Sequence, residues 1–288
     1  MRASPILLAL FSTHVAVAAE TPTAAQIIER IQKNVGVPWH SETVDTFKAG
    51  NPNTPVTGIV TTFAATLDVL QRAAASGKNL IVTHEPTFYN HLDETKEFEN
   101  DPVYRAKRQF IEQHGLVVFR FHDHWHARKP DGILEGMTTA LGWRKFRSPD
   151  DPHLFLIPEQ TLDRFAFDTA TRLKIKTARV IGDPKMKVTK IGLLPGAAGE
   201  TRQVEMLEQD GVEVLVVGEA REWELVEYAQ DSITAGNQKA LIVLGHVVSE
   251  QGGMKYCTEW LKSFVTEVPI EFVPAREPFW NPSNPVES

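Results

Sequence analysis

The chain contains a single cysteine, Cys257, among its 288 residues. An internal disulfide framework is therefore excluded, and so is any zinc or iron–sulfur site built from several cysteines. Transition-metal binding would have to depend on the ten histidines, with carboxylates in support.

Basic charge and long apolar runs are also scarce. Lys and Arg number 30 against 37 Asp and Glu, which gives a formal net charge of −7 and no global electrostatic reason to bind nucleic acid or an anionic membrane. The longest apolar run lies at the N-terminus and is too short to span a bilayer. With 42% hydrophobic and 23% charged residues, the composition is that of a globular protein with a large buried core.

The N-terminus has the features of a targeting segment. Arg2 precedes an apolar stretch over residues 5–19. Ala16-Val17-Ala18 forms a small-residue cleavage site, and Val17-Ala18-Ala19 is equally acceptable one residue later. These features predict a signal peptide over residues 1–19 and an exported protein, periplasmic if the source is Gram-negative. A buried N-terminal helix is the alternative interpretation.

The rest of the chain alternates between helical and strand patterns. Residues 24–35, 65–76 and 101–114 have apolar positions at helical spacing, whereas residues 56–63, 79–83 and 116–121 are short buried strands. Short strands with helices between them predict an α/β fold with mostly parallel strands.

Three strands end in residues that can bind metal: residues 79–83, residues 116–121 and, in the second half of the chain, residues 240–244. Because the carboxyl ends of parallel strands meet at one edge of a sheet, these residues are expected to converge. Each also has an ordinary explanation, such as a hydrogen-bonded loop histidine, a surface histidine cluster or a capped helix N-terminus. The candidate ligands are His84, Glu85, His122, His126, His246 and Glu250.

The stretch His122-Asp123-His124-Trp125-His126 allows two geometries. If the strand continues, all three histidines face the same side. If the chain turns at His122, then His122 and His126 remain candidates and His124 points away.

Nitrogen and oxygen ligands without thiolate suit Zn²⁺, Mn²⁺, Fe²⁺ or Co²⁺. Six donors exceed the needs of one tetrahedral zinc ion. The surplus favours two ions about 3.5–4 Å apart, with Glu85 or Glu250 as a bridging carboxylate.

Residues 57–89, 196–224 and 240–262 resemble the Nif-three-like dinuclear metal-centre proteins, some of which have been named GTP cyclohydrolase I type 2 homologues. The resemblance extends over residues 25–279. It implies two α/β units with mostly parallel or mixed sheets and flanking helices, two metal ions at their junction, and a homo-hexamer. Residues 20–135 plus 240–288 would form the first unit, which carries most ligands, and residues 136–239 the second.

Two positions depart from the family pattern. The paired histidines of the family fall on His84 and Glu85, and its ligating aspartate falls on His126, whereas His246 and Glu250 are intact. One histidine has become a glutamate and one aspartate a histidine, so the number of ligands and their net charge are retained. Glu219 occupies a further family position, as a partner of a ligand or as a solvated loop acid.

The resemblance and the ligand pattern together favour a metal-dependent hydrolase of a small molecule. Glu85 or Glu250 would accept a proton, and His124 would act as general acid. Export disfavours GTP as the substrate. The alternatives are a hexameric protein that binds or buffers metal ions, and a purely structural assembly in which the metal ions only hold loops in place. Three arginines are candidates for holding an anionic substrate or, equally, for solvated surface positions: Arg120, Arg128 and Arg221.

Overall fold

The computed structural model describes residues 21–282. The predicted signal peptide, residues 1–19, lies outside them. Within the described residues, no helix has both the length and the apolar character needed to cross a membrane.

Helices and strands alternate along the chain as the sequence pattern predicts. The helices are α1 (Ala24–Asn34), α2 (Leu67–Ala75), α3 (Pro102–Gln113), α4 (Asp123–Ala127), α5 (Gly132–Leu141), α6 (Leu162–Leu173), α7 (Glu200–Glu208), α8 (Glu227–Thr234) and α9 (His246–Lys262). Short 3-10 turns are η1 (Lys96–Phe98) and η2 (Arg144–Phe146), and η3 (Glu222–Val226) is a π-helical turn. The strands are β1 (Phe47–Ala49), β2 (Ile59–Ala64), β3 (Leu80–Glu85), β4 (Val117–Arg120), β5 (Leu154–Thr161), β6 (Arg179–Ile181), β7 (Lys187–Leu194), β8 (Val214–Val217), β9 (Ala240–Val243) and β10 (Ile270–Phe272).

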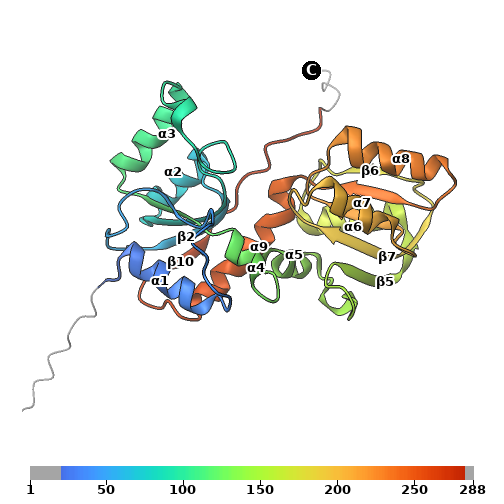
Figure 1. Cartoon of the computed structure of the whole chain (residues 1–288), viewed down its shortest axis with the longest axis horizontal. Helices are drawn as coiled ribbons and strands as arrows, with labels where there is room; N and C mark the ends of the chain where they lie inside the picture. Colours follow the sequence, from blue (N-terminus) through green and yellow to red (C-terminus); the bar gives the residue numbers. More distant parts are fainter. Residues whose placement is uncertain (1–20, 283–288) are drawn as a thin grey trace, which may run out of the picture.

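The first sheet has the order β1-β4-β3-β2-β10, and only β1 runs antiparallel to its neighbour. Successive residues of a strand face opposite sides of the sheet. Ile59 accordingly packs in the core beneath α1 and α9, while Val60 packs beneath α2 and α3. Helices therefore cover both faces of this sheet (Figure 1).

The second sheet has the order β5-β7-β8-β9-β6. Its three central strands are parallel, and β5 and β6 are antiparallel edges. One face packs against α5 and α6, and the other against α7 and α8. The prediction of an α/β protein with two units and mostly parallel or mixed sheets is confirmed.

One predicted boundary is wrong. The sequence assigned residues 240–288 to the first unit, but β9 lies in the second sheet, where it pairs with β8 and β6. All four residues of β9 are buried, because helices cover both faces of this strand. The helix that follows, α9, packs against β2 and β10, so the chain returns to the first sheet only after β9.

Helices α5 and α9 cross in backbone contact between the two sheets (Figure 1). A Cβ atom on Gly136 would lie 2.3 Å from the carbonyl oxygen of Gly252. A Cβ atom on Gly253 would lie 2.5 Å from the Cα of Ile133. Glycine is required at this crossing because no side chain fits between the helices.

Candidate metal centre

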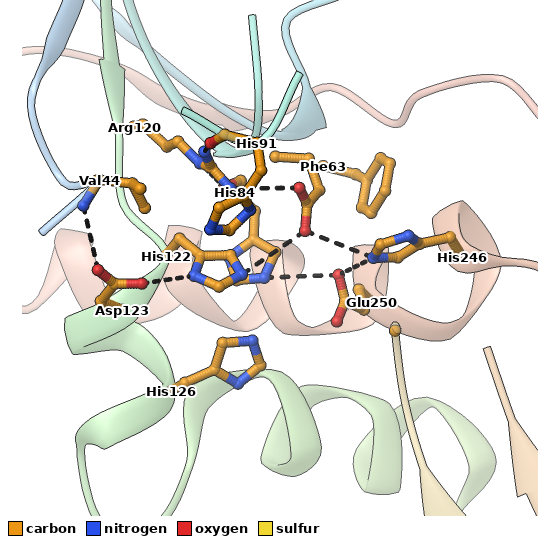
Figure 2. A network of polar contacts seen from close by, with 12 residues as sticks. Val44, Phe63, His84, His91, Arg120, His122, Asp123, His126, His246 and Glu250 are labelled. Carbon is orange, nitrogen blue, oxygen red and sulfur yellow. Dashed lines mark hydrogen bonds and ion pairs between the residues drawn. The ribbon is translucent and has the colours of Figure 1, made fainter. Parts of the chain in front are cut away.

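The six residues predicted as metal ligands lie together in the structure (Figure 2). They come from the carboxyl end of β3, from α4 with its N-cap, and from the first turns of α9. The end of a strand of the first sheet, the helix that follows β4 and the helix that follows β9 of the second sheet thus bring these side chains together. The residues are His84, Glu85, His122, His126, His246 and Glu250.

The chain turns into a helix directly after β4, which decides between the two predicted geometries. Because α4 begins at Asp123, His122 and His126 are four residues apart on the same side of one helical turn. Their ring centroids are 4.9 Å apart, and that of His84 lies 4.6 Å from His122 and 5.0 Å from His126.

The cluster is elongated. The donor atoms of His84, His122 and His126 lie within 4.8 Å of one another, as do those of His84, Glu85 and Glu250. At the other end, His246 Nε2 lies 3.0 Å from Glu250 Oε2 and 3.4 Å from Glu85 Oε1. His84 and the two carboxylates thus connect a pair of histidines at one end to His246 at the other.

Each of the four imidazoles is anchored through Nδ1, so Nε2 is the nitrogen that faces the other residues of the cluster. Such outer hydrogen bonds fix the ring orientation of metal-binding histidines. The anchoring pairs are His84 with the Phe121 carbonyl (3.2 Å), His122 with Asp123 (2.9 Å), His126 with Asp131 (2.9 Å) and His246 with Glu219 (3.0 Å).

His84 provides the test of whether a metal ion fits. Its side chain is fully buried, and its Nε2 has no hydrogen-bond partner although it lies 3.5 Å from Glu250 Oε2. Burial, together with the nearby imidazoles of His122 and His126, holds the pKa of His84 well below its usual value. A neutral imidazole with an unpartnered nitrogen among carboxylates is a donor suited to a divalent cation.

Although burial opposes ionisation, hydrogen bonds from histidines lower the pKa values of the carboxyl groups of Glu85, Asp131 and Glu219. Burial opposes the charge of His246, but hydrogen bonds with Glu219, Glu250 and Glu85 raise its pKa to about 12. Burial likewise opposes the charge of Asp123, yet hydrogen bonds from His122 and Thr43 lower its pKa to about 2. Negative charge therefore surrounds the Nε2 atoms, which favours a cation between them.

The prediction that His124 acts as general acid is wrong, because the side chain faces away from the cluster. It is buried against Trp39, with ring centroids 3.7 Å apart, and its Nδ1 lies 2.7 Å from Asp45 Oδ2. Asp45 also accepts the backbone N–H groups of residues 122–124, so it caps α4. His124 and Asp45 support the helix that carries His122 and His126.

None of the three predicted anion-binding arginines faces the cluster as a free cation. The guanidinium of Arg120 is buried and donates to the His84 and His91 carbonyls and to Glu85. Arg128 lies over the Trp125 ring, 4.7 Å from its centroid, and Arg221 pairs with Glu224 on the surface. Arg120 instead orients Glu85, since Glu85 Oε2 lies 3.4 Å from Arg120 and Oε1 faces His122 and His246.

The cluster opens onto two cavities. The larger, about 770 Å³, has walls from both sheets and reaches the cluster at His122, His126 and Glu250. The smaller, about 680 Å³, lies on the side of Lys107. Glu85 and His246 line both cavities, so the predicted ligands are accessible from two sides.

Sequence reasoning missed Asp131, which anchors His126. Its Oδ1 caps α5 by accepting from the N–H groups of Ile133 and Leu134, and its Oδ2 binds His126 Nδ1. An aspartate just before an apolar helical pattern is an N-cap signal, but the contact with His126 depends on the turn between α4 and α5.

We expect Asp131→Asn to weaken metal binding roughly 10- to 100-fold with little loss of folding stability. Asparagine still caps α5 through its carbonyl oxygen. Its NH₂ group, however, faces His126 Nδ1 and favours the tautomer with hydrogen on Nε2, where the metal would bind. Competition against a chromogenic chelator measures the affinity, and Asp101→Asn at the N-cap of α3 is the matched control. Wild-type affinity in Asp131→Asn would rule out His126 as a ligand.

The chain belongs to the Duf34/NIF3 (NGG1p interacting factor 3) family, whose family model matches residues 17–278. The resemblance stated from the sequence is therefore confirmed. No curated protein sequence matches the chain.

Solved structures with the same fold have low sequence identity to the chain. A Bacillus cereus protein related to NIF3 superposes with a TM-score of 0.72 at 16% identity, covering 91% of this chain and all (100%) of that one. A hypothetical protein of Staphylococcus aureus gives 0.71 at 17% identity, with 90% and 99% covered. Reduced HcgD from Methanocaldococcus jannaschii gives 0.61 at 14% identity, with 87% and 97% covered. At these identities the likeness concerns the fold.

Proposed function

We propose that the protein binds two divalent metal ions, Zn²⁺, Mn²⁺, Fe²⁺ or Co²⁺, in the six-residue cluster and uses them to hydrolyse a small molecule. The observation that carries this proposal is the buried, unpartnered Nε2 of His84 among imidazoles that are all anchored through Nδ1. An apolar core would not retain such an arrangement, because an unpartnered buried polar atom costs free energy.

The elongated shape of the cluster supports two ions rather than one. His122 and His126 would hold one ion and His246 the other, while His84, Glu85 and Glu250 lie between them. Divalent ions bound there would supply Lewis-acid stabilisation of developing negative charge and would acidify water.

The protein's own residues would orient the reactants. Arg120 holds Glu85 by one carboxylate oxygen, so the other oxygen keeps a fixed position between His122 and His246. Glu85 and Glu250 are the carboxylates within reach of the cluster that can accept a proton. The cavity of about 770 Å³ beside them is large enough for a small-molecule substrate.

Metal binding without turnover is the second candidate function, because the same ligands would serve a protein that buffers or delivers ions. The openings on two sides of the cluster favour this alternative, since they allow ions to exchange. Under either function we expect an exported homo-hexamer.

Elemental analysis of the protein without a polyhistidine tag tests the proposal. We expect about two equivalents of metal per chain after repletion and desalting, and close to none in the double variant His246→Ala, Glu250→Ala. The double variant His114→Ala, Glu112→Ala removes the same residue types from the exposed end of α3 and should retain the metal.

Wild-type protein that holds no metal would contradict both the hydrolase and the buffering function. Two equivalents of metal without turnover of phosphoester, amide or cyclic C–N substrates would favour the buffering function.

A further inference from the structure

The larger cavity has a basic wall besides the metal cluster. Three cations form it, from three different segments of the chain: Lys129 between α4 and α5, Arg147 directly after η2, and Arg202 in the first turn of α7. None of them was singled out by the sequence pattern, because they are far apart along the chain.

Arg202 is oriented without being neutralised. Its Nη2 donates to His153 Nε2 at 2.8 Å, and within residues 21–282 this is the side-chain hydrogen bond that holds it. His153 Nδ1 lies 2.9 Å from the Leu193 carbonyl, so Nδ1 carries the hydrogen and Nε2 is free to accept. A neutral acceptor fixes the guanidinium and leaves its positive charge available to a ligand.

Arg147 also retains hydrogen-bonding capacity. It shares the single carboxylate of Glu135 with Arg144, at 2.8 and 2.5 Å, so this group of three carries a net positive charge. The Nε atom of Arg147 is buried and has no partner.

Five carboxylates line the same cavity, and each already has a partner of its own. Asp123 and Asp131 are hydrogen-bonded to His122 and His126, Glu85 and Glu250 belong to the metal cluster, and Glu135 pairs with Arg144 and Arg147. Within residues 21–282, neither Arg202 nor Lys129 forms an ion pair, so these two cations can pair with an anionic ligand.

We propose that this basic wall, centred on Arg202, binds an oxyanion group of the small molecule that the metal cluster acts on. Guanidinium groups bind phosphates and carboxylates through charge-assisted, often paired hydrogen bonds. Binding of the anion rests on the cavity alone, whereas its description as part of a substrate rests on the proposed hydrolase function. The substrate class is then a small acidic molecule, with its phosphate or carboxylate at Arg202 and its reacting group at the cluster.

Calorimetric titration of the full chain with inorganic phosphate and, separately, with succinate tests the proposal. Metal-free protein is used first, so that anions cannot bind to metal, and repleted protein second. We expect saturable binding that Arg202→Gln weakens roughly tenfold or more. His153→Phe, which removes the acceptor that orients Arg202, should weaken it in the same direction. The anion with the higher affinity identifies the chemical group.

Arg164→Gln is the matched control, because it removes an exposed arginine from α6, outside the cavity, and should leave binding unchanged. Absence of binding to the wild type, or equal binding to Arg202→Gln, would overturn the proposal. Lys129→Gln should also weaken binding, which provides a second variant if Arg202→Gln is poorly folded. Anion binding in a protein that takes up no metal would support the basic wall and reject the hydrolase. Metal uptake without anion binding would reject the basic wall and leave the proposed metal-dependent function standing.

Discussion

Replacing Arg120 by methionine is expected to lower the free energy of unfolding by about 3–5 kcal/mol, the usual cost of breaking a buried ion pair from one side. The guanidinium is fully buried, and methionine would leave the Glu85 carboxylate and the His84 and His91 carbonyls without their donor. The side chain of Asp93, also buried, lies 3.9 Å from Arg120; it would retain Lys48 at 3.6 Å and the backbone N–H groups of Thr87 and Phe88.

The same substitution should weaken metal binding roughly 10- to 100-fold, because Glu85 loses the contact that orients it. Urea denaturation followed by tryptophan fluorescence measures the stability, and chelator competition measures the affinity. Arg108→Met removes a partly exposed arginine paired with Glu112 and should change stability by less than about 0.5 kcal/mol. If Arg120→Met were as mild as this control, Arg120 would not orient Glu85.

Asp45→Asn is expected to cost about 3 kcal/mol or more, although the two side chains have the same shape. Asp45 accepts four hydrogen bonds, three from backbone N–H groups of residues 122–124 and one from His124 Nδ1. His124 cannot switch tautomer to accommodate an amide, since its Nε2 already accepts from the backbone N–H of His40. An asparagine NH₂ group would therefore face another donor in a buried site.

Metal content should also fall in Asp45→Asn, because the helix that carries His122 and His126 loses its cap. Asp101→Asn is the matched control: Asp101 caps α3 through two backbone N–H groups, and asparagine is as good an N-cap. Its stability should change by less than about 0.5 kcal/mol. A loss of stability without loss of metal in Asp45→Asn would show that α4 keeps its place without the cap.

The convergence of His84, Glu85 and His122 could be predicted from the sequence because it depends on local patterns. The buried strands β3 and β4 are recognisable one at a time, and neighbouring parallel strands of one sheet present their carboxyl ends at the same edge. His246 follows β9, a strand of the second sheet, so its place beside the other ligands depends on how α9 packs between the two sheets.

The features that were missed depend on distant contacts. The start of α4 at Asp123 is fixed by Asp45, which lies in a loop before β1, so the sequence near His124 could not decide between strand and helix. The apolar residues of β9 fit a central strand of either sheet equally well, so its sheet could not be assigned. Arg120 lies within a strand, and only its buried surroundings show that it holds Glu85 instead of a substrate.

The glycine crossing of α5 and α9 has a consequence for which ligands the protein can accept. Helix α9 carries Glu250, and α5 carries Glu135, which pairs with Arg147. Glu250, Glu135 and Arg147 all line the larger cavity. Because the two helices touch through their backbones at Gly136 and Gly252, their spacing cannot adjust by a change of side-chain rotamer. We therefore expect the protein to discriminate by length among acidic molecules that contact both Arg147, which Glu135 holds, and the cluster at Glu250.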